Sequence, residues 1–185
     1  MLRPNCHLVT RPDAAPSAPG WSVFVPALDR FAPPRRDVLS MLPVADVNGA
    51  LARALETGPA PPDAVGLLLV DPFLNLPDMA ALLKAAGLRA VANYPTVQTL
   101  TGESARALAS VGYGLEQECA LLHRFGELGF ETVGYAASPA AALALVQAGV
   151  SRLVAYPGVG VLDDRSENGI AEAAGGLPLG RHVQG

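Results

Sequence analysis

The sequence predicts an α/β fold in which parallel strands alternate with helices along the chain. Three observations predict it. Half of the 185 residues are hydrophobic and 16% are charged, which is the composition of a folded chain with a sizeable core. Short apolar runs alternate with longer stretches of helical period. Several of these stretches also end alike, with a glycine followed by an apolar residue that begins the next strand.

Five short apolar runs are predicted as strands, because each is apolar on both faces, as the buried strands of a parallel sheet are. In chain order they are Trp21–Ala27, Val65–Val70, Leu88–Asn93, Glu131–Ala136 and Ser151–Tyr156. Strands that alternate with helices form right-handed βα units, which build either a (β/α) barrel or an open doubly wound sheet. A barrel of eight units usually needs roughly 250 residues and only five strands are predicted here, so composition does not choose between the two architectures.

The stretches between these strands have the apolar period of amphipathic helices. They are Asp46–Thr57, Pro77–Ala86, Leu115–Leu128 and Pro139–Ala148. Asp46 and Ser138 stand where an N-cap side chain accepts hydrogen bonds from free N–H groups. Gly87, Gly129 and Gly149 follow three of the helix ends, where glycine supplies the left-handed conformation that closes a helix.

Residues 1–20 and 162–185 are expected to be poorly ordered or loosely packed tails around one ordered domain at 21–161. Both ends are rich in Pro, Gly, Ala and Asp and have no sustained period. An incomplete barrel would leave an unpaired strand edge on each side. We therefore expect the chain to form a homo-oligomer or to need a partner that covers these edges.

Charge and cysteine content exclude several classes of protein. The net charge is −4 and neither sign forms a long run, so the sequence predicts no nucleic-acid or membrane partner. Cys6 and Cys119 form no CxxC pair, which predicts neither a disulfide framework nor a zinc site. Residues 1–20 lack the apolar region of a signal peptide, and Ala64–Val70 is far shorter than the ~20 residues of a membrane span. We expect a cytoplasmic protein.

Polar residues follow several of the predicted strands. In both parallel architectures the carboxyl ends of the strands form the functional face. The residues at these positions are Asp29, Arg30, Asp71, Asn93, Thr96, Tyr135 and Tyr156. Asp71 is either a metal ligand or general base, or the first residue of an Asp-Pro turn whose carboxylate accepts backbone N–H groups. Asn93 and Thr96 either orient a carbonyl or phosphate group, or satisfy a turn around Pro95.

Other polar residues have a structural interpretation beside the functional one. Tyr113, Glu116 and Glu118 precede or open the longest predicted helix, where capping is the favoured interpretation because carboxylates interact favourably with the helix dipole. Asp46, with Asn48 two residues later, either caps a helix or lines the pocket. The sequence contains no dinucleotide-binding, P-loop, zincin or serine-hydrolase motif.

Several motifs in a fixed order carry a resemblance to a known family. They are Met41-Leu42-Pro43 with Asp46 and Asn48, Asp71-Pro72-Phe73, Asn93-Tyr94-Pro95-Thr96-Val97 with Gly102, and Gly112-Tyr113 with Leu115, Glu116 and Glu118. Together they resemble the phosphoenolpyruvate hydrolase-like proteins, a family of TIM-barrel signal-transduction proteins that includes a domain of a plant antiviral resistance protein. The resemblance implies a (β/α)₈-type barrel, assembled as a homo-oligomer and related in shape to phosphoenolpyruvate-utilising enzymes. Since too few strands are predicted for eight units, we expect an incomplete TIM-barrel-like fold over 21–161, with parallel strands and about five to six βα units.

The resemblance and the strand-end residues together lead to an enzyme hypothesis, a hydrolase or lyase acting on a small phosphorylated or 2-oxo acid. The predicted catalytic residues are Asp71, which binds Mg²⁺ or acts as the base, Asn93, which orients the substrate, and Glu116, which holds these groups in place. The predicted substrate-binding residues are Asp46, Asn48, Thr96, Tyr113, Tyr135 and Tyr156.

The sequence also departs from the family pattern at two places. Leu68, Leu69 and Val70 stand where the family has Cys-Gly-Thr, and Tyr156-Pro157-Gly158 stands where it has His-Met-Gly. The loss of these polar groups favours two alternatives to an enzyme. One is a non-catalytic module that binds a small-molecule ligand or regulates another protein, and the other is a structural subunit that needs a partner.

Overall fold

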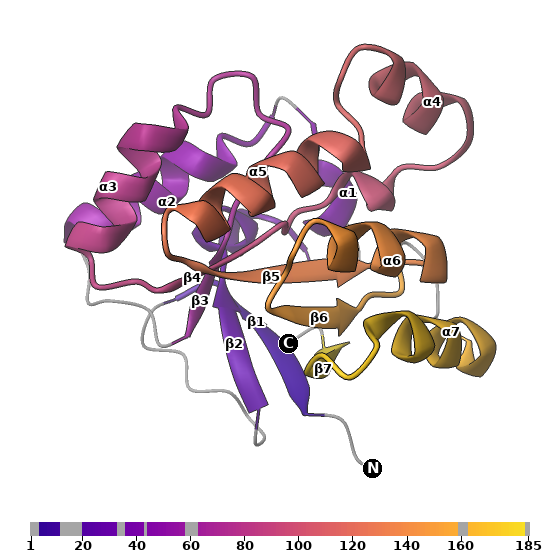
Figure 1. Cartoon of the computed structure of the whole chain (residues 1–185). Coiled ribbons are helices and arrows are strands. Elements are labelled where there is room, and N and C mark those ends of the chain that lie inside the picture. The colour runs from indigo at the N-terminus through magenta and orange to yellow at the C-terminus, as the bar shows by residue number, and fades with distance from the viewer. Residues whose placement is uncertain are drawn as a thin grey trace.

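The chain forms a closed barrel of parallel strands with helices around it (Figure 1). The computed structural model describes residues 4–11, 20–32, 36–42, 44–57, 63–158 and 163–183. The seven strands lie side by side in chain order, and the last pairs with the first. They are β1 (Asn5–Val9), β2 (Gly20–Phe24), β3 (Ala64–Gly66), β4 (Ala90–Ala92), β5 (Glu131–Ala136), β6 (Arg152–Ala155) and β7 (Leu179–Val183).

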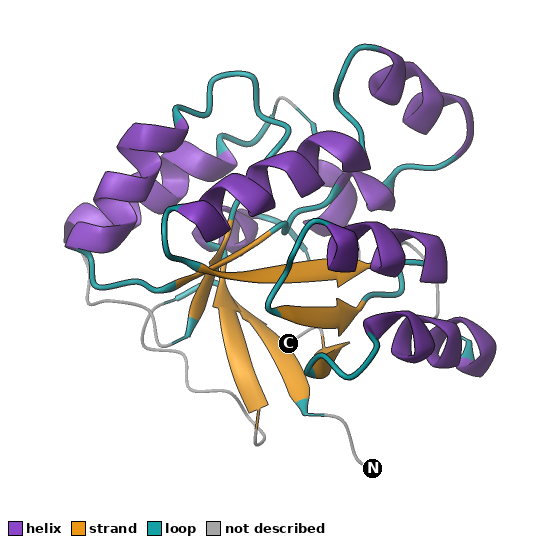
Figure 2. Ribbon diagram, viewed as in Figure 1, coloured by secondary structure: helices purple, strands orange, loops and turns teal. Residues whose placement is uncertain are grey.

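Helices surround the strands, as Figure 2 shows. The α-helices are α1 (Arg36–Ser40), α2 (Val47–Thr57), α3 (Leu76–Ala85), α4 (Gly102–Ser110), α5 (Leu115–Glu127), α6 (Pro139–Gln147) and α7 (Asp164–Ala174). Two 3₁₀ helices, η1 (Pro26–Arg30) and η3 (Val97–Thr99), follow β2 and β4. Helix α4 stands away from the barrel and contains no buried residue (Figure 1). Among the described residues, no helix is both long enough and apolar enough to cross a membrane.

Side-chain alternation along the strands divides the core into two clusters. Alternate residues such as Val23, Ala92 and Val154 pack together in the first cluster, which fills the barrel. Their neighbours Phe24 and Val91 belong to the second cluster, where the outer faces of the strands meet the helices. The helices contribute Leu83, Phe125, Leu145 and Ile170 to this outer cluster. Strands buried on both faces explain why the sequence shows unbroken apolar runs.

The expectation of an incomplete barrel with five to six units is wrong. Strand β1 pairs with β2, for example Cys6 with Trp21, and also with β7, where Cys6 lies opposite His182. Both added strands come from the segments expected as loose tails. Polar residues interrupt their apolar runs, as in Leu179–Val183, so their local pattern does not mark them as strands. Each described strand has two neighbours, which also excludes the open doubly wound sheet.

The elements that the local pattern did predict lie where expected, within a few residues at each end. Strand β5 has the predicted bounds. Gly87, Gly129 and Gly149 have positive φ angles of 74°, 88° and 84°, which confirms the predicted helix ends. The predicted strand Val65–Val70 is shorter in the structure, because the chain leaves the barrel after Gly66 and forms a turn.

Candidate functional site

Four aromatic rings fill the carboxyl-terminal mouth of the barrel. Tyr94, Tyr135, Tyr156 and His182 are here called the mouth cluster, and their ring centroids lie 4.9 to 5.9 Å apart. Each comes two residues after an inward-facing position near the end of its strand, so the alternation of the strand turns its ring inward. The three tyrosines are completely buried. Their hydroxyl groups therefore need partners inside the protein.

Helix α1 supplies the partner for two of these hydroxyls. The buried carboxylate of Asp37 accepts hydrogen bonds from Tyr94 Oη and, at 2.7 Å, from Tyr156 Oη. Burial, and then the nearby Asp37 charge, raise the pKa of both tyrosines. Both phenols therefore stay protonated and act as donors. The positive charge of Arg36, next to Asp37, acts in the opposite direction on the pKa of Tyr94. The mouth thus holds one carboxylate between two phenol donors.

The third tyrosine contacts the first strand. Tyr135 Oη lies 3.0 Å from Cys6 Sγ. Burial raises the pKa of the Cys6 thiol to about 12, so Cys6 is protonated at neutral pH and is no nucleophile there. This contact links β5 with β1 across the barrel.

A second buried carboxylate, Glu118 of α5, lies beside the mouth and organises the loop after β4. Its Oε2 accepts hydrogen bonds from Asn93 Nδ2 at 2.7 Å and Thr96 Oγ1 at 2.8 Å, and its Oε1 accepts one from the N–H of Val97 at 2.8 Å. Burial raises the pKa of Glu118 to about 7, although all three hydrogen bonds lower it. Because every partner is a donor, this arrangement suits the ionised carboxylate.

The same loop is bound to the end of β5. Asn93 Oδ1 accepts a hydrogen bond from the N–H of Tyr135 at 2.7 Å. Gln98 Nε2 donates to Thr96 Oγ1 at 3.0 Å and to the Tyr135 carbonyl at 2.6 Å, and Gln98 Oε1 accepts from the N–H of Ala137 at 2.8 Å. Together with Glu118, these bonds hold the two strand ends that carry Tyr94 and Tyr135.

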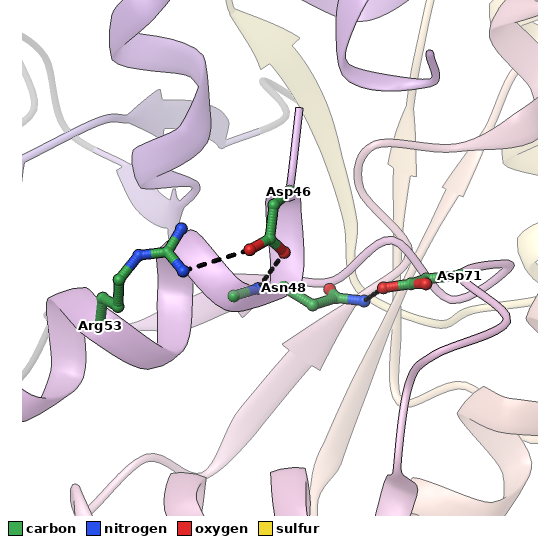
Figure 3. Close-up of polar contacts among 5 residues, drawn as sticks. Asp46, Asn48, Arg53 and Asp71 are labelled. Atoms are coloured by element: carbon green, nitrogen blue, oxygen red, sulfur yellow. Dashed lines mark hydrogen bonds and ion pairs between the residues drawn. The ribbon is translucent and has the colours of Figure 1, made fainter. Parts of the chain in front are cut away.

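Asp71 belongs to a different hydrogen-bond cluster, between α2 and the turn after β3 (Figure 3). Its Oδ2 accepts from Asn48 Nδ2 at 2.9 Å, and its Oδ1 accepts from the N–H of Phe73 at 2.9 Å. Asn48 also exchanges two 3.0 Å hydrogen bonds with the backbone of Leu68. This is the bonding pattern of the Asp-Pro turn interpretation, in which Asn48 holds the turn against α2.

Asp46 stands at the start of the same helix. Its Oδ1 accepts from the N–H of Gly49 at 2.8 Å, and Arg53 Nη1 lies 3.2 Å from its Oδ2 (Figure 3). Asp46 thus caps α2, which was one of its two predicted roles.

Most of the predicted site residues fall into two hydrogen-bonded groups. Asn93, Thr96, Tyr135 and Tyr156 lie at the mouth, whereas Asp46, Asn48 and Asp71 form the cluster of Figure 3. Glu116 is exposed on the first turn of α5, and the buried carboxylate of that turn is Glu118. Two residues apart on a helix, these side chains point to nearly opposite faces. Tyr113 is half-buried and lines a pocket of about 200 Å³ beside α4.

The expected binding of Mg²⁺ by Asp71 stays a prediction. Both carboxylate oxygens already accept protein hydrogen bonds. In the part of the chain that the structure describes, no three His, Cys, Asp or Glu side chains are grouped where they could hold a metal ion.

Sequence reasoning missed several residues of the mouth. Gln98 and Thr99 directly follow the Asn93–Val97 motif, so that motif was the signal that pointed to them. Asp37 and His182 lie in segments where no element was predicted, and Cys6 lies in a predicted tail. Nothing in their local sequence places them at the mouth.

Comparisons with known proteins show the family to which the chain belongs. The family model described as phosphoenolpyruvate hydrolase-like matches residues 38–173. An uncharacterized protein, y4oT, of Sinorhizobium fredii is 32% identical over 156 residues, which are 82% of this chain and 80% of that protein. The tomato (Solanum lycopersicum) ToMV resistance protein Tm-1(GCR237) and susceptible protein tm-1(GCR26) are each 34% identical over 132 residues, which are 68% of this chain but 17% of the tomato proteins. The chain therefore belongs to the phosphoenolpyruvate hydrolase-like family.

Proposed function

We propose that this chain binds a small carboxylic acid at the mouth of the barrel, of the 2-oxo acid or enol-phosphate class. The observation that carries the proposal is the Asp37 carboxylate, which accepts hydrogen bonds from the buried phenols of Tyr94 and Tyr156. The carboxylate of a small acid presents the same acceptor atoms. In the proposed complex it takes the place of the Asp37 carboxylate between the two phenols.

Three further features support a carboxylate ligand. Hydrogen bonds from neutral donors to a carboxylate are stronger than those between neutral groups, because the acceptor is charged. The charge of Arg36 reaches Tyr94, so an anion at the mouth meets a cation as well as two phenols. Membership of a family described as phosphoenolpyruvate hydrolase-like favours the same class, since phosphoenolpyruvate is a small carboxylic acid.

We propose ligand binding, and not catalysis, as the main function of the mouth. Asp37 and Glu118 are the buried carboxylates near the mouth, and both already accept two or more hydrogen bonds. These hydrogen bonds leave fewer lone pairs of either carboxylate to accept a proton from a substrate. Hydrolysis of phosphoenolpyruvate is the second candidate function, and the family match favours it. Release of phosphate and pyruvate by the purified full-length chain would decide for it.

Calorimetric titration of the full-length chain with pyruvate and phosphoenolpyruvate tests the binding proposal, with methyl pyruvate as the uncharged control. Asp37→Ala removes the internal competitor, so we expect tighter binding, by roughly tenfold. Tyr156→Phe removes a charge-assisted donor worth about 1.5–3 kcal/mol, so we expect binding to weaken by roughly tenfold or more. Tyr113→Phe is the matched control and should bind like the parent chain.

The opposite signs of these two effects separate ligand binding from a structural role. If Asp37 and Tyr156 only stabilised the fold, both substitutions would weaken binding or leave it unchanged. The proposal is wrong if neither acid binds to the parent chain or to the Asp37→Ala variant while circular dichroism shows both to be folded.

A further inference from the structure

His182 has an unusual environment within the mouth cluster. Its ring stacks on Tyr94 at 5.8 Å between centroids with an interplanar angle of 28°. It meets Tyr135 edge-on at 5.8 Å and Tyr156 edge-on at 5.2 Å. Its relative exposure is 8%, compared with 0% for the three tyrosines, so the whole cluster is buried.

Among the described residues, neither ring nitrogen of His182 finds a hydrogen-bond partner, and both are shielded from solvent. In the described part of the chain, the other buried side-chain nitrogens without a partner are His7 Nε2 and Trp21 Nε1, one in each residue. Leaving a buried polar group unpaired destabilises a fold. The hydroxyl groups of Tyr94 and Tyr156, whose rings contact His182, are already bonded to Asp37. Within the described residues, His182 therefore has no polar partner.

We propose that His182 is the specificity-determining residue of the mouth site, and that it forms a hydrogen bond with the oxygen on the carbon next to the ligand's carboxylate. The inference rests on the proposed function. His182 packs against Tyr94 and Tyr156, the two phenols that would hold the carboxylate. An oxygen one carbon away from that carboxylate is the ligand atom best placed to reach the imidazole. The site would therefore favour 2-oxo, 2-hydroxy or enol-ester acids over simple carboxylic acids.

The charge state of the imidazole agrees with a neutral oxygen as its partner. Burial lowers the pKa of His182 to about 4, although the charge of Asp37 acts to raise it. At neutral pH the ring is uncharged, with one N–H donor and one acceptor nitrogen. It can donate to a carbonyl or ester oxygen and can accept from a hydroxyl group, and it offers no charge to a second anion.

The test compares pyruvate with propionate, which has the same carboxylate but no oxygen on the next carbon. For the parent chain we expect pyruvate to bind at least roughly tenfold more tightly than propionate, as one buried hydrogen bond would give. In His182→Phe we expect this preference to disappear while the affinity for propionate is unchanged. His182→Asn keeps a donor and an acceptor and should restore part of the preference.

A spectroscopic measurement on the parent chain tests the inference without any substituted variant. With ¹⁵N-labelled histidine, pyruvate should shift the ring nitrogen resonances of His182, and propionate should leave them in place. Unchanged resonances with bound pyruvate would overturn the inference and assign the nitrogens to an internal water molecule. A preference for pyruvate that persists in His182→Phe would also overturn it and would leave the proposed function standing. If neither acid binds to the parent chain or to Asp37→Ala, the proposed function fails, and this inference fails with it.

Discussion

At the scale of single residues, Glu118 determines how the loop after β4 is held, and it does so with a buried charge. Its three donors come from Asn93, Thr96 and Val97, all within one short segment. The hydrogen bonds position the segment but do not fully compensate the burial of the carboxylate, which is why its pKa is about 7. The folded state therefore holds a proton at pH values where the unfolded chain has lost it.

Glu118 should make the protein less stable as the pH rises from about 4.5 to about 7. The pKa rises from 4.5 to about 7 on folding. The free energy of unfolding therefore falls by roughly 3 kcal/mol between these two pH values and does not change further at higher pH. Glu118→Gln cannot ionise, so urea unfolding between pH 4.5 and 8 should show a flatter profile for the variant than for the parent chain.

Glu116→Gln is the matched control for this prediction. Glu116 lies two residues earlier on α5 and is exposed, so its substitution should leave the pH profile as it is in the parent chain. If Glu118→Gln retained the full pH dependence of the parent chain, a group other than Glu118 would have to take up the proton that binds on folding.

At the scale of single elements, the helices differ in how their first turn is held. At α6, Ser138 Oγ accepts a hydrogen bond from the N–H of Ala141 at 3.2 Å. At α4, Thr101 occupies the corresponding position, and its side chain makes no capping hydrogen bond. Helix α6 packs against β5 and α7, whereas α4 has no buried residue. Ser138 and Thr101 both carry a hydroxyl group at an N-cap position, but only the Ser138 hydroxyl caps its helix.

Ser138→Ala should lower the free energy of unfolding by about 1 kcal/mol, because it leaves an N–H group of α6 without its partner. Thr101→Ala should change that free energy by only a few tenths of a kcal/mol, because no capping bond is lost. Chemical denaturation of the two variants and the parent chain measures both values. Equal losses for both variants would contradict the assignment of the cap at Ser138.

At the scale of the whole molecule, closure of the barrel decides which surfaces are exposed. Strand β7 pairs with both β6 and β1, and the N–H of Arg181 donates to the Pro4 carbonyl at 3.0 Å. The open edges from which homo-oligomerisation was expected are therefore paired. Homo-oligomerisation no longer has their support and stays a prediction for sedimentation measurements over a range of concentrations.

Ending the chain at Gly176 should convert the barrel into an open sheet. Removal of β7 leaves β1 and β6 with one unpaired edge each and takes His182 out of the mouth cluster. Exposed strand edges and apolar interior promote association, so light scattering should detect larger species for the shortened chain than for the full-length chain at equal concentration. A shortened chain of unchanged size that unfolds as cooperatively as the parent would show that β7 is dispensable for closure.

The sequence by itself determined what depends on neighbouring residues. The period of the apolar residues located β5 and the four main amphipathic helices, and glycine chemistry located the helix ends at Gly87, Gly129 and Gly149. The Asn93–Val97 motif lies at one side of the mouth, and its residues bond within a short segment and to the helix α5.

Only the tertiary structure decided what depends on residues far apart in the chain. The pairing of β1 with β7 joins the two ends of the described chain, and Asp37 meets Tyr156 across 119 positions. The local period of apolar residues carries no information on such pairs, because the residues next to each partner in the sequence do not determine which distant residue it contacts. The choice between Glu116 and Glu118 has the same origin. Both carboxylates suit the first turn of a helix, and the packing of α5 against the barrel determines which of them is buried.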